Sequence, residues 1–497
     1  MRLKDLLCDV DYQLIQGDIN LEIKDITYDS RKADSDTLFV ALKGFRVDGH
    51  DYIDQAIENG CKCIILEEER DIIDSVTVIK LEDTRTDLSI LSRTLFHYPD
   101  KEMTTIAITG TKGKTTTSSM IKKILEDSGI LCGLIGTMGV FYKDKFYHTM
   151  NTSPESYDVF KYVREMIDNG VHYLVMEVSS QSLKLKRWSN VIFDYAVFTN
   201  LSLDHVGDDE HPDFDDYKYC KSLLFKQCKH GVFNMDSEYF EYMSKSCSGD
   251  ITTYGYDKNA DYQLVSSKNM LESSFIGIEM KTSGKINDIF RVSIPGAFTA
   301  YNAMASIVVT NLLGVSLEDI KKSLLDVSVK GRLEPVNVSN KFHVLIDYAY
   351  QGIAMENVLI TMKESHPKRI VTVFGCGGNR SRQRRYDCGE ISGKYADLSI
   401  LTSDNPRYED NNKIIEDILI GMKKTHGKYV IVPDRKEAIK YSIVNACEGD
   451  VVLILGKGHE DYQEIEGVRY PFDERIIIRE ILDSLTDEEK KKLGIIG

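Results

Sequence analysis

The stretch from Ile106 to Thr117, IAITGTKGKTTT, constrains the fold more than any other part of this chain. An apolar run that favours β structure, Thr104 to Ile108, enters a turn containing glycine, and a helical pattern follows from Ser118 to Asp127. Strand, glycine turn and helix in this order are the context of a phosphate-binding loop. The glycines let backbone N–H groups face a phosphate, and the helix N-terminus adds partial positive charge.

The residue types of this loop indicate binding of ATP with Mg²⁺. We expect Lys114 to reach the β- and γ-phosphates and Thr115 to offer its hydroxyl to Mg²⁺. The loop is shorter than the common G-x-x-x-x-G-K-[ST] form unless Ala107 replaces the first glycine. The alternative is a glycine turn that binds nothing. The ATP-binding residues predicted in this loop are Gly110, Thr111, Lys112, Gly113, Lys114, Thr115 and Thr116.

Size and composition limit the remaining possibilities. At 497 residues the chain is long enough for about three domains, which we place at 1–98, 99–329 and 330–497. A net charge of −16 argues against a nucleic-acid partner. The ten cysteines are scattered, as in reduced cytosolic proteins. The start of the chain resembles no signal peptide, and no run of about 18 apolar residues predicts a membrane span. We therefore expect a cytoplasmic protein without a membrane partner.

The order of apolar runs and helical patterns predicts an α/β protein. Residues 1–98 indicate a small α/β unit with strands at 37–42 and 63–66. Residues 99–329 indicate a parallel sheet around the phosphate loop. Residues 330–497 indicate a doubly wound, Rossmann-like sheet, with strands at 344–347, 370–374, 398–401, 429–432 and 451–455.

Charged residues follow the predicted strands at the ends where ligands bind in open α/β sheets. Glu177 closes a buried run, and His205 follows the next one, so both are predicted to face the phosphate loop as Mg²⁺ ligands. The alternatives are a surface carboxylate and a loop histidine. Lys221, on a predicted helix over 215–225, has no special role by composition alone. In the third domain, loops 375–380, 404–407 and 456–460 describe a binding cleft.

These residues resemble the Mur ligases, most closely the MurE type, over the whole chain. The resemblance rests on an ordered set of motifs: Asp29–Lys32, the phosphate loop, Asn151–Pro154, Glu177–Ser180, Thr199–His205, Tyr301–Ala303, Gly331–Glu334, Asp347–Ala349, Asp404–Arg407 and Gly456–Glu460. The family has three α/β domains, and it implies a cytoplasmic monomeric enzyme of peptidoglycan synthesis. It adds an amino acid to UDP-N-acetylmuramoyl-dipeptide with ATP and Mg²⁺, through an acyl phosphate.

The resemblance also implies a role for each matching position. Lys114, His205 and Lys221 would be catalytic, with Lys221 carbamylated. Thr115, Glu177, His205 and Lys221 would support Mg²⁺. Asn302, Arg332 and Asp347 would contact adenine, phosphate and ribose. The UDP-MurNAc-dipeptide would be bound by Ser30, Asn151, Thr152, Ser153, Ser179 and Arg187. The incoming amino acid would be bound by Arg385, Asp404, Asn405, Pro406, Arg407, Gly456 and Glu460.

Some positions depart from the usual family pattern. Gln181 and Tyr350 stand where many relatives have histidine, Ser153 replaces a frequent threonine, and Lys112 a frequent asparagine. The Val178–Gln181, Thr111–Lys114 and Asp209–Pro212 forms resemble the lysine-adding branch, whereas Asp404–Arg407 resembles the diaminopimelate-adding branch. Because Arg407 suits a second carboxylate, we expect meso-diaminopimelate. L-lysine, a paralogous amide ligase of another pathway and a non-catalytic nucleotide-binding protein are the alternatives.

Overall fold

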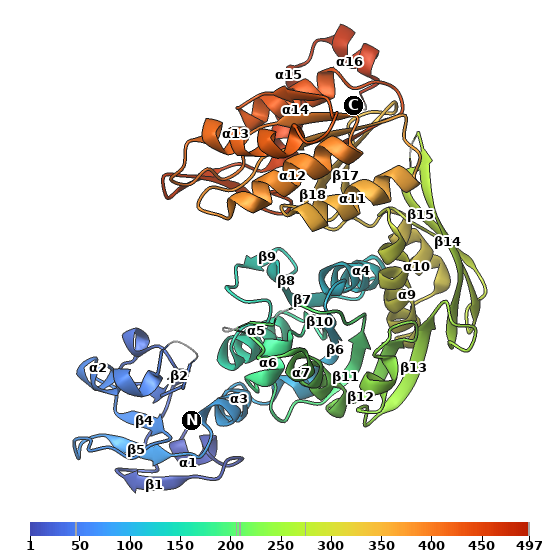
Figure 1. Ribbon diagram of the computed structural model, residues 1–497. Coiled ribbons are helices and arrows are strands. Elements are labelled where there is room, and N and C mark those ends of the chain that lie inside the picture. Colours follow the sequence, from blue (N-terminus) through green and yellow to red (C-terminus); the bar gives the residue numbers. More distant parts are fainter. Residues whose placement is uncertain (45–46, 205, 208–209, 274, 496–497) are drawn as a thin grey trace. The chain divides into compact units, whose positions relative to one another are not determined.

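The computed structural model describes residues 1–44, 47–204, 206–207, 210–273 and 275–495 (Figure 1). These residues form two compact units. The first contains residues 1–262 and 304–316, and the second contains 263–303 and 317–497. The domain boundaries expected after residues 98 and 329 stay predictions.

The amino-terminal part of the first unit is a five-stranded sheet in the order β1-β5-β4-β3-β2. β1 is antiparallel to β5, and the other pairs are parallel. Alternate residues of β3 face opposite sides, so Leu38 and Val40 enter one apolar cluster and Phe39 the other. The strands are β1 (Gln13–Gln16), β2 (Asp25–Thr27), β3 (Thr37–Val40), β4 (Cys63–Leu66) and β5 (Thr77–Lys80), and the longer helices are α2 (Ile53–Glu58) and α3 (Thr84–Leu95).

The phosphate-loop part of the first unit is built on parallel strands in the order β13-β12-β11-β6-β10-β7, extended by antiparallel β8 and β9. The antiparallel extension was not predicted. The strands are β6 (Thr104–Thr109), β7 (Cys132–Gly136), β8 (Gly139–Tyr142), β9 (Lys145–Tyr147), β10 (Tyr173–Glu177), β11 (Phe193–Phe198), β12 (Cys228–Asn234) and β13 (Asp250–Gly255). The helices are α4 (Lys114–Asp127), α5 (Ser156–Asp168), α6 (Ser180–Lys184), α7 (Phe214–Lys226) and α8 (Phe240–Ser244).

The second unit combines an antiparallel segment with a doubly wound sheet. Its carboxyl-terminal sheet has the order β17-β18-β22-β19-β20-β21, with only β17 antiparallel among the described strands. Helices α11 to α13 contribute to the apolar core on one face, and α14 and α15 to the core on the other. This arrangement confirms the predicted α/β class with a doubly wound third part.

The elements of the second unit have the following bounds. The first strands are β14 (Tyr262–Glu272), β15 (Phe275–Gly284) and β16 (Ile289–Val292), and β15 pairs with β16 antiparallel. The carboxyl-terminal strands are β17 (Glu334–Val336), β18 (His343–Asp347), β19 (Arg369–Phe374), β20 (Leu398–Leu401), β21 (Tyr429–Ile431) and β22 (Asp450–Leu455), with a separate hairpin of β23 (Tyr462–Ile465) and β24 (Val468–Pro471). The helices are α9 (Ala297–Leu312), which the unit boundary divides, α10 (Leu317–Leu325), α11 (Gly352–Glu364), α12 (Arg382–Tyr395), α13 (Asn411–Met422), α14 (Arg435–Val444), α15 (Glu474–Ser484) and α16 (Asp487–Leu493).

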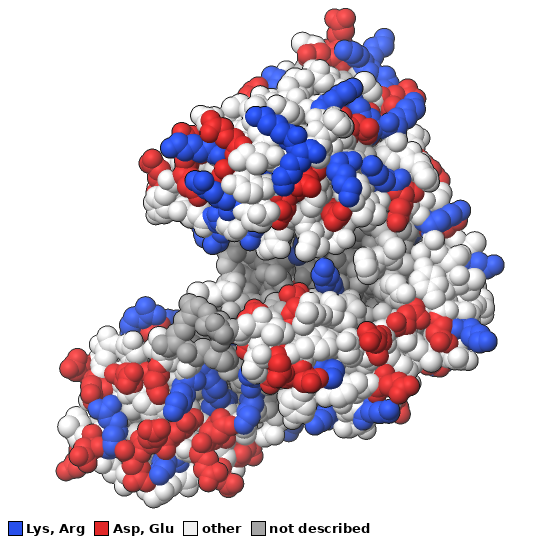
Figure 2. All heavy atoms as spheres, in the orientation of Figure 1, with Lys and Arg blue, Asp and Glu red and all other residues white. Residues whose placement is uncertain are grey.

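Charge is distributed over the surface of each unit. In the face that Figure 2 shows, basic and acidic side chains are interspersed on both units, although acidic residues exceed basic ones in the chain by 78 to 62. Within the described residues, no helix combines the length and the apolar character needed to cross a bilayer.

Candidate active site

The phosphate loop, Glu177 and the segment after β11 meet at one edge of the sheet in the first unit. β6 pairs in parallel with β10 on one side and with β11 on the other. Parallel strands bring their carboxyl ends to the same edge. The register places Glu177 opposite Ile108, two residues before Gly110. Glu177 therefore lies beside the loop, and its role as a Mg²⁺ ligand stays a prediction, whereas His205 lies outside the described residues.

Two glycines give the phosphate loop a backbone that other residues would not adopt. Gly110 has φ +154°, and a Cβ there would lie 2.0 Å from Thr199 Oγ1. Gly113 has φ +87° and forms the N-cap of α4. Asn200 fixes the loop from β11 because its Oδ1 accepts the Lys112 N–H at 3.0 Å, while its carbonyl accepts the Thr111 N–H at 2.9 Å. The loop is therefore held in one conformation at the start of a helix, where anions bind.

Two lysine amines converge on this loop. Lys114 Nζ donates to the Gly110 carbonyl at 2.8 Å, and Lys221 Nζ donates to the same carbonyl at 3.0 Å. Lys221 is almost fully buried. Its burial, together with the positive charge of Lys114, lowers the pKa of the Lys221 amine well below its usual value. α7 thus places an amine of unusual chemistry beside the phosphate loop, a role that composition alone did not indicate.

Tyr217 connects the helix of Lys221 to the same loop. The Tyr217 hydroxyl lies 3.1 Å from Thr111 Oγ1, and Lys221 Nζ lies 4.7 Å from the centre of the Tyr217 ring. Burial raises the pKa of Tyr217 to about 12, so its hydroxyl keeps its proton at neutral pH. Sequence reasoning missed Tyr217, although its spacing of four residues from Lys221 puts both on one helix face.

The buried carboxylate of Glu177 is surrounded by neutral donors. Its Oε2 accepts hydrogen bonds from Thr115 Oγ1 at 3.0 Å and from Thr137 Oγ1 at 2.9 Å, and its Oε1 accepts the Thr137 N–H at 3.2 Å. No lysine or arginine forms an ion pair with Glu177 among the residues that the structure describes. A buried charge normally has a partner of opposite charge. The donor set of a carboxylate and a hydroxyl beside a phosphate loop fits Mg²⁺.

Most residues predicted to bind the UDP-MurNAc-dipeptide gather next to Glu177. Thr152 Oγ1 lies 3.1 Å from Thr137 Oγ1, and Ser153 Oγ donates to the Glu177 carbonyl at 2.9 Å. The Ser179 N–H donates to Ser153 Oγ at 3.1 Å, and Arg187 Nη1 donates to the Ser153 carbonyl at 2.7 Å. Asn151 is exposed, and no side-chain contact joins it to this group within the described chain.

Ser30 belongs to a separate cavity of about 520 Å³ in the first unit. Its hydroxyl donates to Gln55 Oε1 at 2.7 Å. The cavity is also lined by Arg31, Arg85 and Glu155. Glu155 pairs with Arg187 Nε at 3.2 Å, so one carboxylate connects this cavity with the group around Ser153.

The three residues expected to contact adenine, phosphate and ribose belong to the second unit. Asn302 is buried on α9. Asp347 ends β18, where its carboxylate accepts the N–H groups of Leu333 at 2.7 Å and Ala349 at 2.8 Å. Burial raises the pKa of Asp347, although these hydrogen bonds and Arg332 oppose the shift. The guanidinium of Arg332 lies 5.6 Å from the centre of the Tyr348 ring.

The two loops predicted to bind the amino acid touch each other. Asp404 to Arg407 follow β20, and Gly456 to Glu460 follow β22. Asn405 Nδ2 donates to Glu460 Oε2 at 2.9 Å. Gly456 has φ +110°, and a Cβ there would lie 2.6 Å from Asp404 Oδ2, so the close approach requires glycine. Pro406, which precedes Arg407 in the first of these loops, is buried.

Arg385 and Arg407 occupy different environments. Arg385 is buried, and its two terminal nitrogens bind Glu409 and Asp417 at 2.8 to 2.9 Å. Arg385 therefore supports the segment that carries Glu409, and the amino-acid contact expected for it stays a prediction. Its partners lie 24 and 32 residues away, which no sequence pattern shows. Arg407 is partly exposed, donating from Nη1 to the Gly378 carbonyl at 2.7 Å and from Nε to Glu464 at 3.3 Å.

Sequence reasoning also missed Lys457 and left Gln181 unexplained. Lys457 is fully buried, and its Nζ donates to Asn405 Oδ1 at 3.0 Å and Glu460 Oε2 at 3.1 Å. Its place within the Gly456–Glu460 motif was a signal that could have found it. The side-chain amide of Gln181 is buried, and neither of its polar atoms has a hydrogen-bond partner in the described structure. Tyr350 is 39% exposed, and its ring packs against Tyr348.

A phosphate loop with a buried acid beside it, followed by a doubly wound sheet with two joined ligand loops, defines a nucleotide-dependent α/β enzyme. Family models match three successive segments: the Mur ligase family catalytic domain at residues 22–93, the Mur ligase middle domain at 108–310 and the Mur ligase glutamate ligase domain at 331–458. The chain therefore belongs to the Mur ligase family and has its three-domain architecture.

Relatives extend this match over nearly the full length. The UDP-N-acetylmuramoyl-L-alanyl-D-glutamate--2,6-diaminopimelate ligase of Caldanaerobacter subterraneus subsp. tengcongensis is 42% identical over 97% of this chain and 99% of the relative. The corresponding ligase 1 of Clostridium acetobutylicum is 38% identical over 98% of this chain and 100% of the relative. A solved structure of a ligase with this name is similar with a TM-score of 0.74 and 27% identity, covering 97% of this chain and 99% of that one.

Proposed function

We propose that this chain is a UDP-N-acetylmuramoyl-L-alanyl-D-glutamate--2,6-diaminopimelate ligase of peptidoglycan synthesis that uses ATP. The observation that carries the proposal is the convergence of Lys114, Lys221 and buried Glu177 at the phosphate loop. That site occurs in a chain matched along its length by relatives that bear this name. The expected monomeric state and cytoplasmic location belong to the same proposal.

The phosphate loop binds the triphosphate of ATP. Backbone N–H groups at the start of α4 face the phosphates, and Lys114 places its positive charge beside the group that is transferred. Asn302, Arg332 and Asp347 are the candidates for contacts with the rest of the nucleotide. The carboxylate of the substrate attacks the γ-phosphate, ADP leaves, and the carboxylate becomes an acyl phosphate. This step is needed because a free carboxylate is a poor electrophile.

Thr115, Glu177 and a modified Lys221 are the candidates for holding Mg²⁺, with His205 as a further candidate outside the described residues. When bound, Mg²⁺ neutralises charge between the phosphates and the attacking carboxylate. The environment of Lys221 suits its proposed modification. A neutral lysine amine can attack CO₂, release one proton and become an anionic carbamate. Burial of this lysine beside the loop favours the neutral amine that the reaction requires.

The amine of the incoming amino acid then attacks the acyl carbonyl, phosphate leaves, and an amide bond forms. Exclusion of water matters at this stage because water would hydrolyse the acyl phosphate. We assign binding of the incoming amino acid to the joined loops after β20 and β22. Arg407 is the candidate partner of the second carboxylate of diaminopimelate, which L-lysine lacks.

Product formation tests this proposal directly. Purified protein would receive ATP, Mg²⁺, UDP-MurNAc-L-Ala-D-Glu and either meso-diaminopimelate or L-lysine, and the nucleotide product would be identified by mass spectrometry. We expect a tripeptide product containing diaminopimelate. A preference for L-lysine would reject diaminopimelate as the amino acid that is added, but it would leave the assignment as a ligase standing. ATP turnover that does not depend on the dipeptide substrate would reject the ligase assignment.

Lys114→Ala tests whether the phosphate loop is the catalytic site. We expect at least about a thousandfold loss of ligation at saturating ATP, because no other lysine of the loop lies at the start of α4. Lys123→Ala is the control, since Lys123 lies on α4 beyond the loop and its Nζ pairs with Asp127 at 3.0 Å. Equal activities of the two variants would show that the loop is not the catalytic phosphate site.

A further inference from the structure

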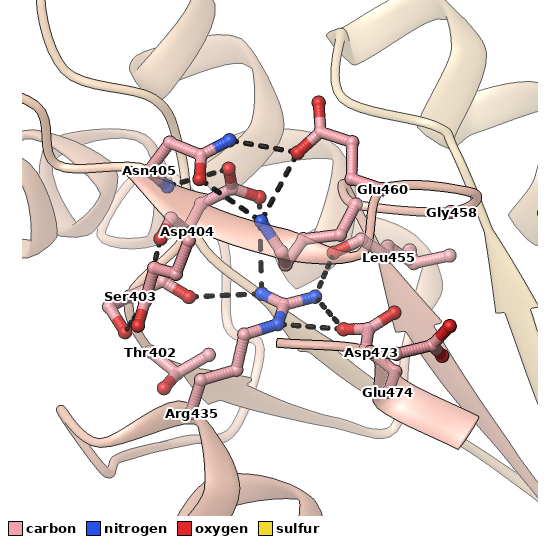
Figure 3. A network of polar contacts seen from close by, with 12 residues as sticks. Thr402, Ser403, Asp404, Asn405, Arg435, Leu455, Gly458, Glu460, Asp473 and Glu474 are labelled. Atoms are coloured by element: carbon pink, nitrogen blue, oxygen red, sulfur yellow. Dashed lines mark hydrogen bonds and ion pairs between the residues drawn. The ribbon is translucent and has the colours of Figure 1, made fainter. Parts of the chain in front are cut away.

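Arg435 lies at the centre of a buried polar network behind the two loops assigned to the amino acid. It is the first residue of α14 and is among the largest fully buried side chains of the described chain. A buried guanidinium is costly unless its donors and its charge are matched. Figure 3 shows its planar head group between Ser403, Leu455 and Glu474.

The donors of Arg435 bind both loops at their origins. Nη1 donates to the Ser403 carbonyl at 3.0 Å, directly before the Asp404–Arg407 loop. Nη2 donates to the Leu455 carbonyl at 2.8 Å, directly before the Gly456–Glu460 loop. One rigid guanidinium therefore fixes the separation between the two places where the ligand loops leave the sheet.

Glu474 holds the guanidinium in this orientation. Its Oε1 accepts from Arg435 Nε at 2.8 Å and forms an ion pair with Nη2 at 2.7 Å. Glu474 is fully buried, and its Oε2 has no hydrogen-bond partner within the described residues. The three nitrogens of the planar guanidinium reach one carboxylate oxygen and two carbonyls, in directions that a lysine ammonium cannot reproduce.

We propose that Arg435, oriented by Glu474, is a positioning residue that sets the spacing of the Asp404–Arg407 and Gly456–Glu460 loops and thereby the affinity for the incoming amino acid. This inference rests on the proposed function and identifies residues that support its amino-acid site. In the structure Arg435 binds Ser403, Leu455 and Glu474, and its Nη1 lies 4.0 Å from Asp404 Oδ2. It acts through the two loops, which also meet through Lys457 and Asn405.

The pair of Arg369 and Asp450 provides a matched control in the same unit. Arg369 begins β19 and Asp450 begins β22, where the two residues are register partners. Arg369 Nε donates to Asp450 Oδ2 at 3.1 Å, and Asp450 is almost fully buried. This ion pair therefore joins the amino ends of β19 and β22. Arg435 instead contacts the carboxyl end of β22 and the segment after β20, in the same sheet.

The experiment compares Arg435→Lys with Arg369→Lys in the full-length protein. KM would be measured separately for diaminopimelate, ATP and UDP-MurNAc-dipeptide, together with kcat and the unfolding temperature. We expect Arg435→Lys to raise KM for diaminopimelate about tenfold or more, with KM for ATP and the dipeptide within about twofold. We expect Arg369→Lys to lower stability and to leave all three KM values within about twofold.

The outcomes separate this inference from the proposed function. A wild-type protein that forms no diaminopimelate product overturns the proposed function before any variant is compared. If the wild type is active, similar KM values in Arg435→Lys and Arg369→Lys overturn the positioning role. If Arg435→Lys does not fold, the double variant Arg435→Gln/Glu474→Gln replaces it, because it removes both buried charges. In that protein the same selective rise in KM supports the inference, and unchanged KM overturns it.

Discussion

Glu177 shows how a single side chain can link folding to ligand binding. Its carboxylate is fully buried but receives only neutral hydrogen-bond donors among the described residues. Such a charge disfavours the folded state until a cation arrives. A Cβ at Gly136 would lie 2.3 Å from Glu177 Oε1, so the strand beside it leaves room for the carboxylate by carrying glycine.

Glu177→Gln should separate stability from ligand response. We expect the free energy of unfolding without Mg²⁺ to stay within about 1 kcal/mol of wild type, because the substitution removes a buried charge and one weak hydrogen bond. Stabilisation by Mg²⁺ with ATP, measured as a rise in unfolding temperature, should be lost together with activity.

Asp194→Asn is the contrasting variant. Asp194 accepts the Thr105 N–H at 2.8 Å and pairs with Lys229 at 2.7 Å, at the amino end of β11. We expect this change to reduce stability and to preserve the response to Mg²⁺ with ATP. Equal ligand responses in Glu177→Gln and wild type would remove Glu177 from the metal site.

Asp87 on α3 should make stability depend on pH. Burial, with the negative charges of Asp83 and Asp11, raises the pKa of Asp87 from 3.8 to about 6. The folded protein therefore holds this proton more tightly than the unfolded chain. The resulting stabilisation is present at low pH and is lost as pH rises from 3.8 through about 6. Asp87→Asn should be more stable than wild type at about pH 7.5 by about 1 kcal/mol, a value reduced for solvent screening.

Asp83, the N-cap residue of α3, tests the sign of this prediction. Although burial opposes the shift, hydrogen bonds from Lys186 and Thr86 lower the pKa of Asp83 to about 2. Its contribution is present above the unfolded value of 3.8 and is lost as pH falls toward about 2. Asp83→Asn should therefore destabilise the protein at about pH 7.5 in urea unfolding. If both variants shift stability in the same direction, the electrostatic explanation is wrong.

At the scale of elements, α7 joins the phosphate loop to α6. Tyr217 and Lys221 face the loop from α7. Asp216 on the same helix accepts from Lys184 Nζ of α6 at 2.7 Å. The buried His211 lies with Nδ1 2.7 Å from Asp216 and Nε2 2.9 Å from Ser180. Contacts with the phosphate loop and with α6 therefore hold α7 in place, so a substitution at Lys221 should leave the position of the helix unchanged.

Lys221→Ala should remove the anion that a carbamate would supply. We expect at least about a hundredfold loss of activity, with partial recovery when acetate or another short carboxylate is added. Lys218→Ala is the control on the same helix, since Lys218 pairs with the exposed Asp215. Ligation rates with and without acetate provide the measurement. Full activity of Lys221→Ala, or identical responses of both variants to acetate, would contradict a catalytic role of a modified Lys221.

The sequence predicted strands well where a short, continuous apolar run is buried on both faces. The strands expected at 63–66 and 398–401 have those bounds in the structure, and the helix expected at 215–225 extends over Phe214–Lys226. The hairpin of β23 and β24 was not predicted because its strands are largely exposed and mix polar with apolar residues. That hairpin supplies Glu464, which contacts Arg407. Partners such as Glu409, Asp417 and Glu474 were also missed, since long-range ion pairs leave no local pattern.

At the scale of the whole molecule, the residues assigned to ATP belong to both units, whereas the two loops assigned to the amino acid belong to the second unit alone. The phosphate loop is in the first unit, and Asn302, Arg332 and Asp347 are in the second. None of these ATP candidates lies in the loops after β20 and β22, so amino-acid selection should be separable from ATP binding by substitution. Arg407 offers the sharpest test because its proposed ligand group, the second carboxylate, is present in diaminopimelate and absent from L-lysine.

Arg407→Ala should abolish the preference for diaminopimelate. In the structure Arg407 Nη1 is held by the Gly378 carbonyl and Nε by Glu464, which orients the fork while leaving the side chain partly exposed. A bidentate pair with a carboxylate supports about a hundredfold discrimination. We expect kcat/KM for diaminopimelate to fall by about that factor, KM for ATP to stay within about twofold, and the low activity with L-lysine to change little. Arg382→Ala, at a side chain that is 73% exposed, is the matched control and should behave as wild type. An unchanged ratio of kcat/KM for the two amino acids in Arg407→Ala would assign the selectivity to another residue of the two loops.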